Sequence, residues 1–306
     1  MTSRQRPGDA PFTRRNPRVA AASRLRRRRN RDAAGRFLAE GPQAVREALG
    51  RPGTVRELFT TPESAHRHPD LVDAARQAGV PVRTVTEQAA AALSETVTPQ
   101  GLVAVCDRVD VPLAAALSPP PRLAAVLVEI RDPGNAGTVL RTADAAGAGL
   151  VVFAGDAVDP YNGKCVRATA GSLFHVPVVR AADPAAAVDA LRAAGLRVLA
   201  ATGRGETDLD ALPDRALAAP TAWLFGSEAH GLPVPLLEAA DQRVRVPIHG
   251  RAESLNLAAA AAVCLYTSAR AQRRKEPDRD PEDVPPTREP RARDVEPARR
   301  WRAKDV

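Results

Sequence analysis

The chain has 306 residues, of which 44% are apolar, 3% aromatic and 26% charged, with a formal net charge of +8. This length favours one large or two modest domains, and so few aromatic residues imply an aliphatic core. The chain has no run of about 18 apolar residues, which excludes a membrane-spanning helix, and no apolar signal core follows its basic start, so we expect a cytoplasmic protein.

The three cysteines are Cys106, Cys165 and Cys264. They lie far apart in the sequence, which excludes a disulfide framework and a local zinc site. This use of cysteine suits a reducing compartment.

Positive charge is concentrated at the start of the chain. Residues 1–31 hold eleven arginines and one acid, a net of +10, and residues 271–306 carry +2, which leaves −4 for residues 32–270. Arginine runs are often solvated and disordered, but they also bind phosphate backbones by releasing counterions. We therefore predict a disordered basic tail over 1–31 that contacts nucleic acid, and a disordered, proline-rich charged tail over 271–306. The nucleic-acid contacts are expected at Arg24, Arg26, Arg27, Arg28 and Arg29.

Residues 32–109 alternate short apolar strands with helices, which is typical of an α/β layer structure. The strands are predicted over 36–40, 55–60, 82–85 and 101–106. The helices are predicted over 43–49, 69–78 and 87–93. A linker over 110–121 follows, because it ends in three prolines that continue neither a helix nor a central strand.

Residues 122–270 again alternate strands and helices, beginning with an apolar run suited to a buried parallel strand. The strands are predicted over 123–130, 150–153, 176–179, 197–201, 222–225 and 243–247. The helices are predicted over 138–146, 164–174, 184–194, 232–239 and 254–271. In open sheets of this class ligands bind beyond the carboxyl ends of the strands, so we expect the loops there to surround one pocket.

The first of these loops is the stretch 134–137, Gly-Asn-Ala-Gly. Its free N–H groups at a helix start suit an anion or a polar ligand, although it matches neither a phosphate-binding loop nor a dinucleotide fingerprint. Arg141 follows one helical turn later, where its side chain can reach back toward the loop. The alternatives are a tight turn and an ordinary surface arginine.

The second loop contains Gly226, Glu228 and His230. Glycine permits close approach of the backbone to a flat ligand. Glu228 is suited to bind a cation or support the loop, and His230 is either an acid–base group or polar surface.

The third loop runs from 246 to 256. Ser254 is expected to be a helix N-cap. Asn256 would then lie in the first turn of a buried helix, where it needs hydrogen-bonding partners.

In this order, the three segments resemble the signature motifs of the SpoU (TrmH) RNA 2′-O-ribose methyltransferases of the SPOUT superfamily. The resemblance spans roughly residues 122–268 and includes Arg167–Ser172 and Pro177. Residues 24–106 resemble the ribosomal-protein-like substrate-binding domain that precedes the catalytic domain in many members.

The resemblance implies an α/β sheet with a deep trefoil knot, and a homodimer in which each site is completed by the partner. It implies that S-adenosylmethionine lies bent in the knot, held mainly by backbone groups. The implied cofactor contacts are Gly226, Val246, Ile248 and Leu255, with Thr202 and Gly203 as further candidates. The implied catalytic or supporting residues are Arg141, Asn135, Glu228, Ser254 and Asn256.

The chemistry is consistent with these residue types. The cofactor's sulfonium already activates the methyl group, so no metal is required, and holding the reacting atoms in line at about 3–3.5 Å supplies much of the rate. A guanidinium, with a pKa above about 12, rarely gives up its proton. We therefore expect Arg141 to bind the adjacent phosphate and stabilise the developing alkoxide. The phosphate and Glu228 remain alternative proton acceptors.

We predict a methyltransferase acting on RNA, most specifically ribosomal RNA. The alternatives are a tRNA methyltransferase and a non-catalytic RNA-binding protein of ribosome assembly. A nucleotide-binding oxidoreductase is disfavoured, because the dinucleotide fingerprint is missing.

Overall fold

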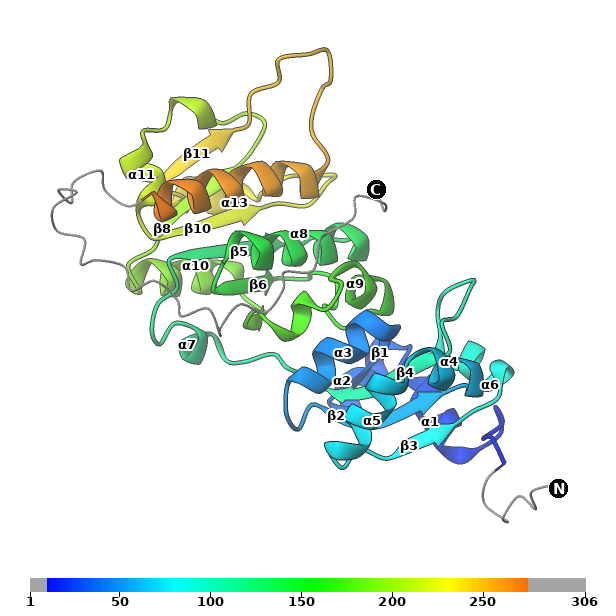
Figure 1. Cartoon of the computed structure of the whole chain (residues 1–306). Coiled ribbons are helices and arrows are strands. Elements are labelled where there is room, and N and C mark those ends of the chain that lie inside the picture. Colours follow the sequence, from blue (N-terminus) through cyan, green and yellow to red (C-terminus); the bar gives the residue numbers. More distant parts are fainter. Residues whose placement is uncertain (1–9, 275–306) are drawn as a thin grey trace, which may run out of the picture. The chain divides into compact units, whose positions relative to one another are not determined.

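The computed structural model describes residues 10–274, which form an N-terminal and a C-terminal domain with one sheet each (Figure 1). The predicted tail over 271–306 falls almost wholly outside the described residues, as do residues 1–9. The last helix continues to Arg273, slightly beyond the predicted end of the domain.

The N-terminal domain is a four-stranded sheet with the order β1-β4-β2-β3, in which β4 is antiparallel to both neighbours. Alternate residues of the strands face opposite sides, so helices α3 and α5 cover one face and α1 and α6 cover the other. The strands are β1 (Arg36–Glu40), β2 (Val55–Thr60), β3 (Val82–Thr84) and β4 (Leu102–Asp107). The helices are α1 (Pro17–Arg24), α2 (Arg28–Ala34), α3 (Pro42–Gly50), α4 (Pro62–Arg67), α5 (Pro69–Gln77) and α6 (Glu87–Leu93).

The prediction of a disordered tail over 1–31 is wrong for the part that the structure describes. Helix α1 begins at an Asn16 cap and buries Val19 and Ala22, and Leu25 follows them into the same core. The spacing of three residues places these side chains on one helical face. The charge count hid this face, because these few apolar residues lie in a segment that holds eleven arginines. The N-terminal domain therefore begins well before residue 32.

The C-terminal domain is a seven-stranded sheet with the order β7-β6-β5-β10-β8-β11-β9, and every pairing in it is parallel. The strands are β5 (Leu123–Val128), β6 (Leu150–Ala154), β7 (Val178–Ala181), β8 (Arg197–Ala201), β9 (Thr207–Asp208), β10 (Thr221–Phe225) and β11 (Gln242–Arg245). The helices are α7 (Leu113–Ala116), α8 (Pro133–Ala146), α9 (Gly163–Ala168), η1 (Ser172–Phe174), α10 (Pro184–Ala193), η2 (Leu209–Ala211), α11 (Asp214–Ala218), α12 (Val234–Ala239) and α13 (Leu257–Arg273).

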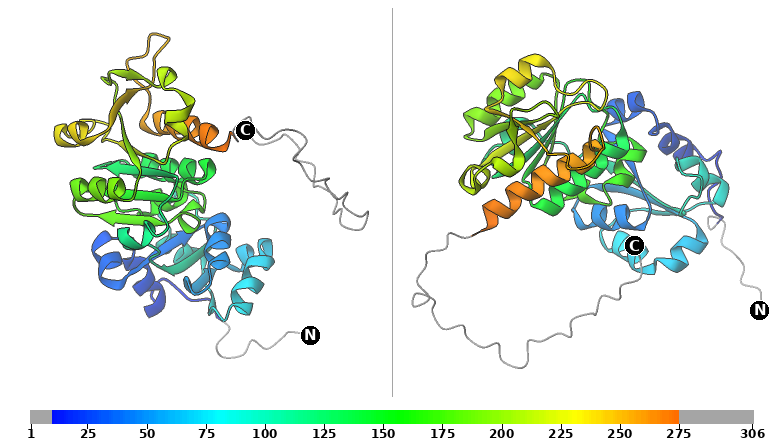
Figure 2. Two further views of the ribbon diagram at one scale, coloured as in Figure 1. Left: turned by 90° about the vertical axis from the view of Figure 1, so that its left-hand side faces the viewer. Right: turned by 90° about the horizontal axis from the view of Figure 1, so that it is seen from above.

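Helices cover both faces of this sheet, as the α/β prediction requires (Figure 2). Along β5, Leu123, Ala125 and Leu127 face the core shared with α8 and α13, whereas the residues between them face α10 and α12. Helices α8 and α13 lie side by side on their face. The indole of Trp223 in β10 donates a 2.9 Å hydrogen bond to Ser268, which fixes α13 against the sheet.

The helix predicted over 164–174 is interrupted. It forms α9 and the short η1, because Ala170 (φ 49°) and Gly171 (φ 101°) take the left-handed conformation between them. A side chain at Gly171 would collide with Glu47 of α3, so this break also lets the two domains approach.

Buried polar and aromatic groups join the two domains. The Arg31 guanidinium contacts Asp159 at 2.7 Å, and both side chains are less than 5% exposed. Phe37 of β1 packs against Tyr161, with ring centroids 4.7 Å apart.

All three cysteines are buried and free. Burial raises the pKa of Cys264 to about 12, so this thiol stays protonated at neutral pH.

Candidate active site

Four neighbouring strands of the C-terminal sheet end at one edge. Leu127 of β5 pairs with Phe225 of β10, Phe225 pairs with Ala201 of β8, and Ala201 pairs with Val244 of β11. Because the strands are parallel and in register, the segments that follow them start side by side. The three motif segments therefore start at the carboxyl edge of one sheet, as expected, and a pocket that they surround stays a prediction.

One side chain from each motif segment enters a chain of hydrogen bonds at this edge. Asn135 Nδ2 donates to Glu228 Oε1 at 2.9 Å. Asn256 Nδ2 donates to Asn135 Oδ1 at 3.2 Å. The three residues are separated by 93 and 121 positions in sequence, so only the fold brings them together.

Asn256 fixes one end of this chain of hydrogen bonds at the start of α13. Its Oδ1 accepts the Ala258 N–H at 2.9 Å, and its carbonyl accepts the Ala260 N–H. Asn256, rather than Ser254, is therefore the N-cap, and the prediction for Ser254 is wrong. Asn256 is also exposed rather than buried, because it precedes the helix instead of lying within its first turn. With its oxygen engaged by the helix, its amide nitrogen is directed to Asn135.

The stretch 134–137 is the first turn of α8 and not an open loop. Asp132 caps this helix by accepting the Asn135 N–H at 2.8 Å, and its other oxygen accepts from Lys164 at 2.7 Å. The bonds from Lys164 and the Asn135 backbone hold the pKa of Asp132 below its usual value. A carboxylate thus occupies the helix start, which disfavours an anion at these N–H groups, and the alternative of a polar ligand stays a prediction.

The two motif glycines provide close backbone approach. A side chain at Gly137 would collide with Cys165 and Ala168 of α9, so this glycine serves helix packing. A side chain at Gly226 would collide with the backbone of Gly231 and Leu232. The loop from 227 to 231 closes on itself through paired backbone hydrogen bonds, and Glu228 stands on it.

Two family models match the chain: the SpoU rRNA Methylase family over residues 122–266 and the MRM3-like substrate binding domain over residues 16–104. The chain is 36% identical to the 23S rRNA (guanosine(2553)-2′-O)-methyltransferase RlmP of Bacillus subtilis, over 82% of this chain and 95% of that protein. The chain belongs to the SpoU rRNA methylase family. The resemblance drawn from the three motifs is therefore confirmed.

Solved structures of SpoU proteins share the fold. An AdoMet-bound rRNA methyltransferase from Sinorhizobium meliloti matches with a TM-score of 0.72 and 32% identity, over 83% of this chain and 95% of that one. The SpoU methyltransferase AviRb from Streptomyces viridochromogenes, in complex with AdoMet, matches with a TM-score of 0.72 and 30% identity, over 83% and 98%.

Some of the cofactor residues implied by the SpoU motifs follow neighbouring strands, and others lie on a projecting loop. Gly226, Thr202 and Val246 follow adjacent strands, and the Thr202 N–H donates to the Val244 carbonyl of β11 at 2.9 Å. Gly203 is exposed in the same turn as Thr202. The segment between β11 and α13 projects as a loop (Figure 1). Ile248 and Leu255 lie on it, with 37% and 39% of their surface exposed.

Arg141 of the first SpoU motif does not join the hydrogen-bonded chain. It follows Asn135 by six residues on α8, which is about 9 Å along the axis and on a different face. Its side chain is exposed and forms no hydrogen bond or ion pair with any residue from 10 to 274. The structure of one chain therefore leaves the expected catalytic arginine available to another molecule.

The clustered arginines expected to bind RNA stand on folded backbone. Arg24 ends α1, Arg26 and Arg27 form the turn to α2, and Arg28 and Arg29 begin α2. All five side chains are exposed.

Sequence reasoning missed the groups that join the two domains. Besides Arg31 and Asp159, Arg167 donates to Glu40 at 3.2 Å, and His175 lies between Asp144 (2.8 Å) and Glu47 (3.1 Å). No local pattern pairs residues more than a hundred positions apart. The cap Asp132 did carry a signal, since an aspartate directly before Pro-Gly is typical of a helix start.

Residues 10–274 contain no group of three or more His, Cys, Asp or Glu side chains arranged to hold a metal ion. No helix within the same range is long and apolar enough to cross a membrane.

Proposed function

We propose that this protein is an S-adenosylmethionine-dependent methyltransferase that modifies a ribose 2′-hydroxyl of ribosomal RNA. The observation that carries the proposal is the chain Glu228–Asn135–Asn256, which joins one polar side chain from each SpoU segment at one edge of the sheet. The B. subtilis relative is named for a guanosine of 23S rRNA, which favours ribosomal RNA over tRNA. This substrate implies the cytoplasm, which stays a prediction.

The residues present fit the cofactor. Backbone groups at Gly226 and Thr202 lie at adjacent strand ends, and the close packing of Gly226 leaves no room for a side chain there. Ile248 and Leu255 offer apolar side chains that nothing in the described chain fully covers. Such surfaces suit the flat adenine ring, with the backbone groups holding its polar atoms. When bound, S-adenosylmethionine supplies a methyl group activated by the positive sulfur.

Glu228 is the proposed acceptor of the 2′-hydroxyl proton. Its Oε1 accepts from Asn135, which leaves Oε2 for the substrate. Asn135 is itself fixed, because its oxygen accepts from Asn256. This arrangement keeps the carboxylate oriented, which is what general-base catalysis requires. The phosphate next to the ribose is the alternative acceptor.

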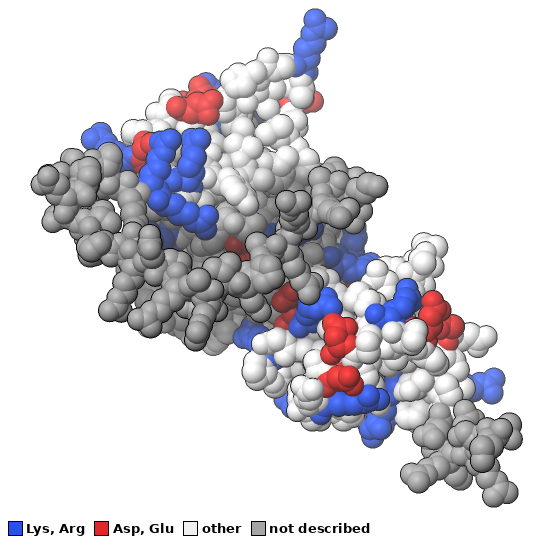
Figure 3. Space-filling model, in the orientation of Figure 1, with Lys and Arg blue, Asp and Glu red and all other residues white. Residues whose placement is uncertain are grey.

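Arg141 is proposed to act across a homodimer, binding the substrate phosphate and stabilising the alkoxide in the partner's site. Helices α8 and α13 cover the same face of the sheet, and their outer faces adjoin. On α13, Val263 and Tyr266 are 41% and 50% exposed, and the helix carries no charged residue from Leu257 to Ala269. In Figure 3, basic side chains gather toward the end of this helix, and the surface beside them is white. An uncharged surface beside an unpaired arginine suits a self-complementary interface. We also propose that the chain forms the trefoil knot that the resemblance implies.

The test is methyl transfer from labelled S-adenosylmethionine to purified ribosomal RNA and to tRNA, followed by mapping of ribose methylation. We expect label in ribosomal RNA at one ribose. Label in tRNA alone would show that the substrate is tRNA and not ribosomal RNA. RNA binding without any label would establish the non-catalytic alternative and overturn the proposal.

A further inference from the structure

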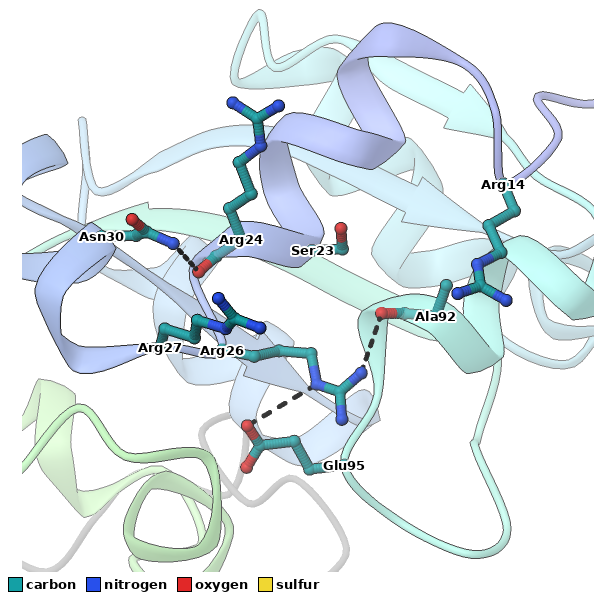
Figure 4. Close-up of a pocket in the computed structure, with 8 residues that line it drawn as sticks. All are labelled: Arg14, Ser23, Arg24, Arg26, Arg27, Asn30, Ala92 and Glu95. Carbon is teal, nitrogen blue, oxygen red and sulfur yellow. Dashed lines mark hydrogen bonds and ion pairs between the residues drawn. The ribbon is translucent and has the colours of Figure 1, made fainter.

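The N-terminal domain contains a hollow of about 540 Å³ between α1, the turn into α2 and the end of α6 (Figure 4). Among residues 10–274, four arginines line it, and Glu95 is the one acidic side chain in its wall. We call it the arginine hollow; its arginines are Arg14, Arg24, Arg26 and Arg27. It belongs to a different domain from the Glu228–Asn135–Asn256 chain.

One arginine of the hollow is structural. Arg26 donates to the Ala92 carbonyl at 3.5 Å and lies 3.7 Å from Glu95. Ala92 lies in the last turn of α6, where the carbonyls lack partners within the helix. Arg26 therefore ties the turn before α2 to the end of α6.

The other three arginines have no such role. The guanidinium groups of Arg14, Arg24 and Arg27 form no hydrogen bond or ion pair with any residue from 10 to 274. In Figure 4, Arg14 extends toward the end of α6 from the side opposite Arg26. Unpaired like charges on neighbouring segments repel each other, so their arrangement favours a bound anion.

The backbone under these arginines is fixed. Val19, Ala22 and Leu25 bury α1 and the start of the turn against α6. Asn30 donates to the Arg24 carbonyl at 2.8 Å, which closes the turn. The positive charges therefore stand on a preformed frame, and binding an anion there does not require the chain to fold first.

We infer that the arginine hollow binds the phosphate backbone of the RNA substrate. This inference rests on the proposed function, and it names the site by which the N-terminal domain holds that RNA. Guanidinium groups bind phosphate oxygens through paired N–H donors. No aromatic side chain of the described chain lines the hollow, so these residues offer no surface for stacking a base, and contact with the RNA backbone follows. The volume exceeds that of a single ion, since a water molecule takes about 30 Å³.

The arginines at the start of the chain should differ in how much they contribute to RNA binding. Arg28 lies 3.8 Å from Asp32 and, like Arg29, does not line the hollow. Binding should therefore depend on Arg14 and Arg27 more than on total charge. Arg15 provides a matched control, because it adjoins Arg14 in sequence, is also exposed and lies outside the hollow.

The experiment measures binding of ribosomal RNA to the full-length protein without cofactor over a range of salt concentrations. We expect Arg14→Gln and Arg27→Gln each to weaken binding several-fold and to reduce the salt slope by about one. Arg15→Gln should change little. Glu95→Gln should tighten binding, because it removes the negative charge from the wall.

A gain of affinity in Glu95→Gln cannot come from misfolding, so it keeps the test valid if an arginine variant is unstable. Equal losses in Arg14→Gln and Arg15→Gln would show diffuse attraction and overturn the inference. Competition by inorganic phosphate at millimolar concentration would indicate a free-anion site, and equal competition by polyglutamate would indicate an acidic protein; either result would contradict the inference.

Measurements of methyl transfer distinguish a failure of this inference from a failure of the proposed function. Variants of the arginine hollow should raise KM for RNA and leave kcat unchanged. If wild-type protein methylates no RNA, the proposed function fails while the binding series still tests the hollow. If methylation occurs and the variants bind normally, the hollow fails alone.

Discussion

At the edge of the seven-stranded sheet, the side chains of Asn135 and Asn256 each donate a hydrogen bond to a neighbour. In the arginine hollow, by contrast, the guanidinium groups of Arg14 and Arg27 bond to no residue between 10 and 274. The difference corresponds to two functions, proton transfer at the edge of the sheet and phosphate binding in the hollow. A group that moves a proton must be oriented, so its neighbours are engaged in hydrogen bonds. A group that binds a phosphate must be available, so it stands unpaired on a rigid frame. Changes at the edge should therefore act on kcat, and changes in the hollow on RNA affinity.

The largest effect is expected at Arg141. Arg141→Ala should lower methyl transfer by about 100- to 1,000-fold, because it removes the group proposed to stabilise the alkoxide. Binding of S-adenosylmethionine, measured by calorimetry, should be unchanged. Equal loss of cofactor binding would contradict a role on the substrate side.

Glu228→Gln should lower kcat by about 100-fold, since it removes the proposed proton acceptor. RNA affinity should be unchanged, which distinguishes this edge from the hollow. Mixing this variant with Arg141→Ala tests the dimer, because one mixed dimer then contains one complete site. Recovery of about a quarter of wild-type activity is expected after random exchange of protomers. No recovery would place Arg141 in its own chain's site.

Arg31→Ala should destabilise the fold by about 3–5 kcal/mol, because it leaves Asp159 buried without its partner. Urea denaturation measures the change. The combination of Arg31→Met with Asp159→Leu should recover much of the lost stability, since no buried charge remains. If Arg31→Ala unfolds at the wild-type urea concentration, the contact is not stabilising. Deletion of residues 1–31 would remove both the positive charge of this segment and the contact between Arg31 and Asp159. A loss of RNA affinity in that variant could therefore not be assigned to the charge alone.

The smallest effect concerns pH. Burial lowers the pKa of His175, but hydrogen bonds with Asp144 and Glu47 outweigh it, and the net pKa is raised above its ordinary value. The protonated ring then stabilises the contact between the domains at pH values below about 6.5, and this stabilisation is lost as the pH rises through the raised pKa. Unfolding free energy should therefore fall in the wild type as the pH rises above about 6.5. His175→Gln should remove this slope, and an unchanged slope would assign it to other groups.

Local patterns predicted most elements of the fold. Strand β2 and helix α6 have the predicted bounds, because the Val, Phe and Thr of β2 favour a strand and the alanine run of α6 favours a helix, and both signals lie within a few positions. The pattern failed where a few apolar residues stand among many arginines, as in α1. It also failed at α13, where the signal for a cap at Ser254 was real but Asn256 took the role.

The sequence by itself determined the fold class, the family and the identity of the chemical groups, because periodicity and motif order are properties of local sequence. Only the tertiary structure decided which groups meet. Glu228, Asn135 and Asn256 meet because four parallel strands end in register, and Arg141 stays apart because six residues turn it to another face of α8. The folded frame also turned part of an arginine-rich segment into a lined hollow, because burial of three apolar side chains fixed the backbone beneath the charges.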